Sequence, residues 1–285
     1  MITPQEPQLY HFSGTQPPLD SFGPGATALQ NRYFSTPVPA PKHRLDLLLL
    51  ARGFYESREK AQRAIMAGEV SMAGRVMDKA GTKIPEDAVI AVKTPDRYVG
   101  RGGHKMEAAL KEFGIDPRGA ICLDIGASTG GFTDCLLQHG AAKVYAIDVG
   151  HSQLDWKIRR DPRVVVREKL NARYLSRADI PEEIALCVID VSFISLSLIL
   201  PPALELLRPQ GVIIPLIKPQ FELRKEDVAH GGVVRDPALH ARAVEKIRAF
   251  VSANLQCQWS GCIESPILGG SGNKEYLACL RSVLG

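Results

Sequence analysis

The chain has 285 residues, of which 45% are hydrophobic and 23% charged, and its formal net charge is +4. This composition is typical of a globular protein that is long enough for one large core or two domains. The longest apolar runs are short or interrupted by Ser, Pro and Glu, and the N-terminus does not have the pattern of a secretory signal. We therefore expect a cytoplasmic protein without a membrane partner.

Residues 1–41 differ in composition from the rest of the chain. They contain eight prolines and many Ser, Thr, Gln and Gly residues, without a hydrophobic period. Such a segment has too little apolar surface to form a core of its own. We predict a flexible N-terminal tail.

Residues 42–100 have the pattern of a small α+β module and a linker. Short helices are predicted over residues 42–53 and 57–68, each ended by a glycine, with Ser57 as the N-cap of the second. A hairpin turning at Ala73–Gly74 and a further strand within residues 85–92 follow.

This module is also basic, with eleven Lys and Arg residues against eight Asp and Glu. Either a solvated helix face or a surface for RNA phosphates explains such a charge run, and composition alone does not separate the two. The stretch RLDLLLLARGFYESREKAQRAIMAGEVSMAGRVMDKAGTKI resembles an S4 domain, which implies RNA binding. The candidate RNA contacts are Arg44, Arg52, Arg58, Lys60 and Arg63.

Residues 101–285 alternate strand-like apolar runs with helical stretches. This alternation predicts an α/β fold, in which helices cover both faces of a mostly parallel sheet. The last two runs are joined by SPILGGSGNK, which is too short for a crossover helix, so we expect the last strand to be antiparallel.

The six cysteines are scattered through this part of the chain, and no two of them form a CxxC pair. Several lie in apolar runs, which favours reduced, buried thiols over disulfides or a zinc site. We expect no metal centre. The positions are Cys122, Cys135, Cys187, Cys257, Cys262 and Cys279.

A glycine-rich turn follows the first of these strands, in the sequence CLDIGASTGGFTDCLL. The spacing of its glycines does not match the GxGxxG pattern of dinucleotide sites, and no lysine follows for a P-loop. S-adenosylmethionine has an adenosine and an amino-acid tail but no phosphate, so it fits this turn. Asp148, at the end of the next strand, can accept hydrogen bonds from ribose hydroxyls. The alternative is a structural turn with a solvent-facing acid.

Seven motifs taken together, GRGGHKMEAAL, LDIGASTGGFTD, AIDVG, IDVSFISL, IKPQFE, GGVVRD and SGNKEYL, resemble the TlyA family. That family joins an S4 domain to an FtsJ-type methyltransferase domain. The resemblance covers the chain from about Arg44 onward. It implies a Rossmann-like methyltransferase fold with a seven-stranded sheet in residues 101–285, and S-adenosylmethionine as methyl donor. The candidate donor-binding residues are Asp124, Gly126, Ala127, Ser128, Gly130, Gly131, Phe132, Asp148 and Asn171.

The resemblance also implies a reaction, the methylation of ribose 2′-hydroxyls by a Lys–Asp–Lys–Glu tetrad. Lys218 is then the group that steers or deprotonates the hydroxyl, while Asp190 and Glu275 orient the lysines and offset their charge. For any one of these residues alone, a surface ion pair is the usual explanation. The matching positions are Lys105, Asp190, Lys218 and Glu275.

The implied substrate is ribosomal RNA, free or in a ribosomal subunit, with cytidine as the target. The family also has the name haemolysin, so a pore-forming protein is one alternative, and a non-catalytic RNA-binding protein is another. Residues 230–237, HGGVVRDP, are expected to form a flexible loop over the site. The oligomeric state is left open by the sequence.

Overall fold

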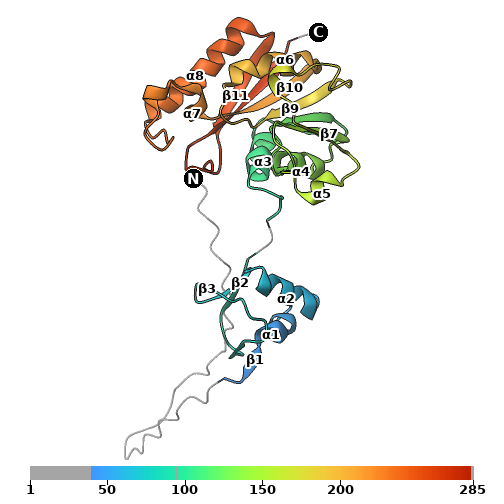
Figure 1. The fold of residues 1–285 in the computed structure, drawn as a ribbon, viewed down its shortest axis with the longest axis vertical. Helices are drawn as coiled ribbons and strands as arrows, with labels where there is room; N and C mark the ends of the chain where they lie inside the picture. Colours follow the sequence, from blue (N-terminus) through green and yellow to red (C-terminus); the bar gives the residue numbers. More distant parts are fainter. Residues whose placement is uncertain (1–39, 94–95, 284–285) are drawn as a thin grey trace, which may run out of the picture. The chain divides into compact units, whose positions relative to one another are not determined.

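The computed structural model describes residues 40–93 and 96–283, which form two compact units on either side of residues 94–95 (Figure 1). The predicted flexible tail lies outside the described residues, apart from Ala40 and Pro41. Each unit has its own hydrophobic core. We call residues 40–93 the first unit and residues 96–283 the second unit.

In the first unit two helices pack over short strands, around a core that includes Leu45, Leu49 and Ile65. A two-stranded sheet joins β1 to β4, and a three-stranded sheet has the order β3-β2-β5. The elements are β1 (Lys42–Arg44), α1 (Leu45–Ala51), α2 (Arg58–Met66), β2 (Val70–Met72), β3 (Arg75–Val76), β4 (Lys83–Pro85) and β5 (Ile90–Val92).

Two local predictions for this unit are confirmed and one is wrong. The Ser57 hydroxyl caps α2 by accepting a hydrogen bond from the Lys60 N–H at 3.3 Å. The hairpin turns at Ala73 and Gly74, whose φ angles are +48° and +77°. The first helix does not begin at residue 42, because residues 42–44 pair with β4 as a strand.

The second unit is built on one seven-stranded sheet with the order β11-β12-β10-β9-β6-β7-β8. The five strands from β10 to β8 are parallel, while β12 pairs antiparallel with both β10 and β11, as expected. The strands are β6 (Ile121–Ile125), β7 (Lys143–Asp148), β8 (Val164–Glu168), β9 (Ile184–Ile189), β10 (Leu207–Ile217), β11 (Cys257–Glu264) and β12 (Tyr276–Ser282).

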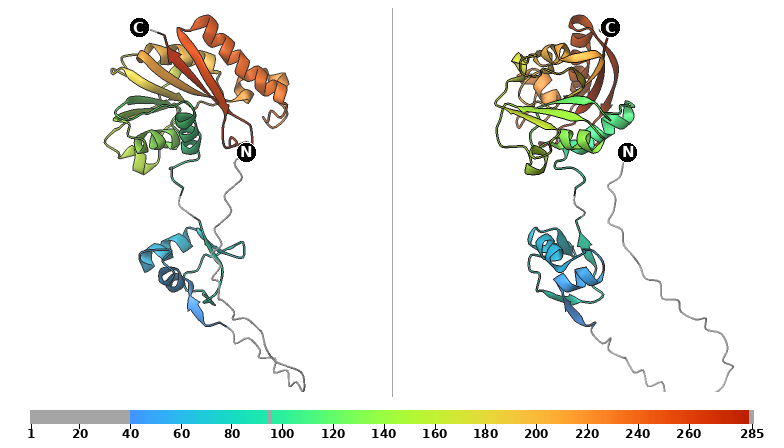
Figure 2. Two further views of the ribbon diagram at one scale, coloured as in Figure 1. Left: turned by 180° about the vertical axis from the view of Figure 1, so that it is seen from behind. Right: turned by 90° about the vertical axis from the view of Figure 1, so that its right-hand side faces the viewer.

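Helices cover both faces of this sheet (Figure 2). Side chains of α3, α4 and α5 belong to the core on one face, and those of α6 and α8 belong to the core on the other. The helices are α3 (Gly102–Glu112), α4 (Gly131–Gln138), α5 (Trp156–Arg159), α6 (Leu200–Glu205), α7 (Pro219–Glu222) and α8 (Pro237–Asn254), with 3-10 turns η1 (Ala172–Tyr174), η2 (Leu196–Leu198) and η3 (Lys225–Asp227).

The register of the central strands brings two loops together at the carboxyl edge of the sheet. Ile125 of β6 is paired with Ile189 of β9, so Gly126 and Asp190 follow their strands side by side. A Cβ atom on Gly126 would lie 2.3 Å from the Asp190 carbonyl oxygen, and the φ angle of Gly126 is +86°. Only glycine fits this close approach.

The six cysteines are free thiols, four of them buried and two partly buried. Burial raises the pKa of the Cys122 and Cys135 thiols to about 12, and of Cys257 and Cys262 to about 11. The cysteines are unpaired and at least partly buried, in agreement with the prediction of free thiols. None of the helices in residues 40–93 and 96–283 has the length and apolar character needed to cross a membrane.

Candidate active site

Two cavities open at the carboxyl edge of the sheet and share the glycine turn. The first, which we call the turn cavity, has a volume of about 190 Å³ and lies between the turn and the start of α3. The second, which we call the strand-end cavity, has a volume of about 340 Å³ and extends from the turn to the ends of β7, β8 and β9. In doubly wound folds, ligands bind at this edge of the sheet.

The candidate donor-binding residues are distributed over both cavities. Of them, Gly126 and Ser128 line both cavities, while Asp148 and Asn171 line the strand-end cavity. The turn cavity is also lined by three residues of the turn and the following helix: Ala127, Gly131 and Phe132. Gly130 lies behind the turn, where a Cβ atom would be 2.8 Å from Leu154.

Asp148, at the end of β7, stabilises the glycine turn through hydrogen bonds. One of its oxygens accepts the Ser128 N–H at 2.9 Å, and the other accepts the Gly150 N–H at 2.7 Å. A carboxylate has about four lone-pair positions, so Asp148 keeps capacity for further hydrogen bonds. Asn171 caps η1 by accepting the Arg173 N–H at 3.1 Å.

Asp124 lies beneath the turn and lines neither cavity. It is fully buried, and the Thr133 hydroxyl donates to one of its oxygens at 2.6 Å. The other oxygen has no hydrogen-bond partner among the described residues. Burial, together with the negative charges of Asp190 and Asp148, raises the pKa of this carboxyl to about 7.

The four tetrad positions form two ion pairs. Lys105 of α3 lies 2.5 Å from Glu275, and both side chains are at least nine-tenths buried. Lys218, at the end of β10, lies 2.6 Å from Asp190 and donates a hydrogen bond to the Ser192 hydroxyl at 2.9 Å. Because Lys105 and Asp190 both line the turn cavity, the two pairs meet there.

The loop of residues 230–237 is fixed to the segment that carries Glu275. The Asn273 side chain accepts the Val234 N–H at 2.8 Å and donates to the Gly232 carbonyl at 2.9 Å. Asn273 is 1% exposed and Val234 is 3% exposed, so this anchor is buried.

Some site residues were missed from the sequence. Arg101 and Thr129 line the turn cavity, and the segment of residues 191–194 lines the strand-end cavity. The sequence signal for the first two was present, since they lie within the GRGG and ASTGG motifs. Residues 191–194 could be placed only once the register of β9 against β6 was known.

Four of the five candidate RNA contacts in the first unit have internal partners. Asp46 of α1 is fully buried and accepts hydrogen bonds from Arg44 at 2.9–3.0 Å and Arg58 at 2.9 Å. Both arginine side chains remain more than 40% exposed. Arg52 donates to the backbone carbonyls of Glu86 and Ala88, Lys60 pairs with Glu56, and Arg63 is exposed on α2. The sequence did not indicate a structural role for Asp46, because this residue lies within an otherwise apolar helix.

The second unit combines the sheet order of a doubly wound fold, an antiparallel last strand and a glycine turn that faces two Lys–carboxylate pairs. These features define the class of Rossmann-like methyltransferases, here in one chain with a small basic module.

Comparisons with known proteins agree with this class. The FtsJ-like methyltransferase family matches residues 98–282, and the S4 domain family matches residues 43–90. YqxC of Bacillus subtilis (strain 168) is 51% identical over 247 residues, covering 86% of this chain and 87% of YqxC. The 16S/23S rRNA (cytidine-2'-O)-methyltransferase TlyA of Mycobacterium tuberculosis is 44% identical over 245 residues, covering 85% of this chain and 91% of that protein.

A solved chain from Streptococcus thermophilus that is named a haemolysin is 44% identical, with a TM-score of 0.65, covering 85% of this chain and 89% of that one. The chain belongs to the FtsJ-like methyltransferases and, within them, to the TlyA family, in which an S4 domain precedes the methyltransferase domain.

Proposed function

We propose that this protein transfers a methyl group from S-adenosylmethionine to a ribose 2′-hydroxyl of ribosomal RNA, with cytidine as the target nucleoside. The observation that carries the proposal is the meeting of two Lys–carboxylate pairs at the turn cavity. The name of the Mycobacterium tuberculosis relative supports the choice of substrate. An enzyme acting on ribosomal RNA works where ribosomes are assembled, so the proposal includes a cytoplasmic location.

The residues present fit the proposed donor. Asp148 and Asn171 in the strand-end cavity would hold the adenosine, and the glycine turn would hold the amino-acid tail. Gly126 lets the turn approach the Asp190 backbone, and the buried Asp124 carboxyl lies beneath the turn. When bound, S-adenosylmethionine supplies an electrophilic methyl group on a sulfonium.

The chain's own part in the reaction is to position and activate the hydroxyl. A 2′-hydroxyl is a poor nucleophile, so it must be aligned and must lose its proton. Lys218 is the group that steers or deprotonates it, with Asp190 and Ser192 fixing the amine. Glu275 fixes Lys105, which lines the same cavity as Asp190. Alignment of donor and acceptor lowers the barrier because it removes the entropy cost of bringing them together.

The first unit would bind the RNA backbone. Arg44 and Arg58 are fixed by Asp46 while their guanidinium groups stay accessible, so little side-chain entropy is lost when they contact phosphates. Arg63 lies exposed on the same helix as Arg58. The proposed substrate is therefore an RNA. The S4 domain binds the phosphates of this RNA, and the second unit modifies one of its riboses.

The test is transfer of labelled methyl from S-adenosylmethionine to purified small and large ribosomal subunits that lack the modification. We expect label on a ribose 2′ oxygen, and a loss of at least ~100-fold in rate for Lys218→Ala with donor binding retained. Lys225→Ala is the matched control, because Lys225 is exposed on η3. A Lys218→Ala protein with the wild-type rate would refute the assignment of Lys218.

The wild-type result decides between the alternatives. Bound donor without label on either subunit would point to another RNA substrate. An absence of donor binding would favour a non-catalytic RNA-binding protein. The name haemolysin suggests membrane permeabilisation, which leakage of dye from liposomes would detect at the protein concentrations used for the transfer assay.

A further inference from the structure

Glu222, at the end of α7, is a buried carboxylate that contacts a segment far away in the sequence. It is 3% exposed. The Ser195 hydroxyl donates to one of its oxygens at 2.6 Å, and the Leu196 N–H donates to the other at 2.8 Å. A buried carboxylate is costly unless its oxygens are hydrogen-bonded, and here both are.

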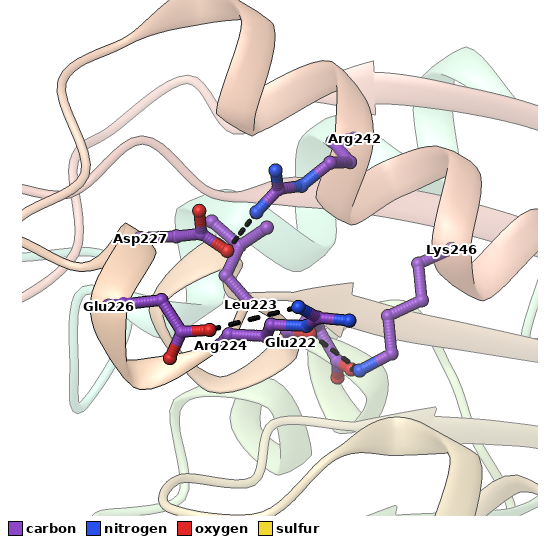
Figure 3. Close-up of a pocket in the computed structure, with 7 residues that line it drawn as sticks. All are labelled: Glu222, Leu223, Arg224, Glu226, Asp227, Arg242 and Lys246. Carbon is purple, nitrogen blue, oxygen red and sulfur yellow. Dashed lines mark hydrogen bonds and ion pairs between the residues drawn. The ribbon is translucent and has the colours of Figure 1, made fainter.

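Lys246 of α8 holds Glu222 from the opposite side. Its amine donates to the Glu222 carbonyl at 2.5 Å and lies 3.4 Å from a carboxylate oxygen. Figure 3 shows the Lys246 side chain reaching toward Glu222 along the wall of a charged cavity. Glu222 is therefore fixed to a long helix that belongs to the core of the second unit.

The contacts of Glu222 complete a series that begins at the proposed reaction centre. Residues 190–196 follow β9 and residues 218–222 follow β10. The two segments are joined at one end by Lys218 with Asp190 and Ser192, and in the middle by the rings of Phe193 and Phe221, with centroids 5.0 Å apart. Glu222 joins them at the other end.

The segment between Asp190 and Ser195 has a strained backbone. Phe193 has a φ angle of +63° and is 91% exposed, so burial of its side chain contributes little to stabilising this conformation. A bulky residue in the left-handed region is strained and persists only where neighbouring contacts hold the chain. The Asp190 N–H is fixed by the Ile125 carbonyl on one side, and Glu222 fixes the other side.

We propose that Glu222 is a positioning residue for methyl transfer. By holding Ser195 and Leu196, it keeps Ser192 and Asp190 against the amine of Lys218. The inference rests on the proposed function, because it assigns Glu222 to the alignment of the same lysine. A displacement of about 1 Å at a reacting group can lower a rate by about 100-fold.

The experiment compares Ser195→Ala, Glu222→Gln and the double variant with wild type in the full chain. Ser195→Ala removes one hydroxyl, and Glu222→Gln keeps the side-chain shape and an acceptor for Leu196. Glu226→Gln is the matched control, because Glu226 lines the same cavity but forms an exposed pair with Arg224 at 3.8 Å. The measurements are the single-turnover rate of methyl transfer to ribosomal subunits, the affinity for those subunits, and the unfolding temperature.

We expect each single variant to lower the single-turnover rate by about 10-fold or more, with unchanged affinity for the subunits and wild-type behaviour in Glu226→Gln. The double variant should be no slower than the slower single variant, because both changes act on one contact, the hydrogen bond between Ser195 and Glu222.

Two results would overturn the inference while leaving the proposed function intact. One is a wild-type rate in both single variants, measured well below their unfolding temperatures, even if those temperatures are lower. The other is a double variant whose rate loss is the product of the two single losses. A wild-type chain that transfers no methyl to any ribosomal RNA would overturn the proposed function, and this inference with it.

Discussion

Asp124 has a charge state that depends on folding. Its carboxyl is fully buried beneath the glycine turn and has an oxygen without a partner among the described residues. Burial raises its pKa from the ordinary value of 3.8 to about 7. The folded chain therefore binds a proton here between about pH 4 and pH 7, where the unfolded chain does not. By linkage, this group lowers the free energy of unfolding as pH rises through that window.

We expect Asp124→Asn to remove this loss of stability. Asparagine keeps an acceptor for the Thr133 hydroxyl but has no proton to release. The variant should gain stability relative to wild type as pH rises from 5 to 8, by on the order of a few kcal/mol. Urea unfolding of both proteins at several pH values measures the difference. An equal change of stability with pH in the two proteins would contradict the assigned pKa.

Asp124 also shows how far a motif can place a single residue. The motif LDIGASTGG placed Asp124 among the donor-binding candidates, and the structure puts its side chain beneath the turn rather than in a cavity. A sequence motif identifies the segment near a ligand, but it does not show which side chains of that segment face the ligand. The direction in which each side chain points depends on the pleat of β6 and on the packing of β6 against α4.

Within the elements of the first unit, Asp46 couples α1 to α2. It accepts hydrogen bonds from Arg44, before α1, and from Arg58 and Gln62 on α2. The Arg44 side chain, more than any other contact, lowers the pKa of the Asp46 carboxyl. The lowered pKa of Asp46 stabilises the folded unit at pH values above the ordinary pKa of an aspartate. This stabilisation is lost as the pH falls through the lowered pKa.

Asp46→Asn should destabilise the S4 domain by about 2–3 kcal/mol, because it leaves two arginines without their buried counter-charge. It should also weaken RNA binding, since Arg44 and Arg58 would no longer be held in place. Scanning calorimetry and RNA binding measured over a range of salt concentrations test both effects. Glu69→Gln, outside this network, is the control. Unchanged stability would mean that the buried charge contributes no net free energy.

The parallel strands of the second unit were predictable because each contains an apolar run, and the antiparallel direction of the last strand followed from a short connection. Strand β1 was not predictable, because residues 42–44 read as the start of a helix and pair with β4 about forty residues later. The role of Glu222 was also not predictable, because its hydrogen-bond partners lie 26 and 27 residues away in the sequence. Pairings between distant segments are set by the fold, not by local pattern.

For the molecule as a whole, the division into two units predicts a separation of tasks. The two cores of the second unit consist only of its own residues, from Tyr98 to Leu280. A fragment of residues 96–285 should therefore fold and bind S-adenosylhomocysteine as the full chain does. Its affinity for ribosomal RNA should fall by at least ~10-fold, because it lacks the basic side chains of the S4 domain.

Calorimetric titration with S-adenosylhomocysteine and filter binding with ribosomal RNA measure the two properties of the fragment. The full chain is the reference in both assays. Equal RNA affinity of fragment and full chain would show that the second unit alone grips the substrate, and would remove the proposed role of Arg44 and Arg58.

The full or partial burial of the six cysteines makes the chain suitable for site-specific labelling. A thiol reacts with maleimides and methanethiosulfonates as its thiolate, which the raised pKa values suppress at neutral pH. A cysteine introduced at exposed Lys79 in the first unit and another at exposed Arg118 in the second would be the reactive positions. Spin labels or fluorophores attached there would report the distance between the units, and its change when RNA binds, without prior removal of any native cysteine.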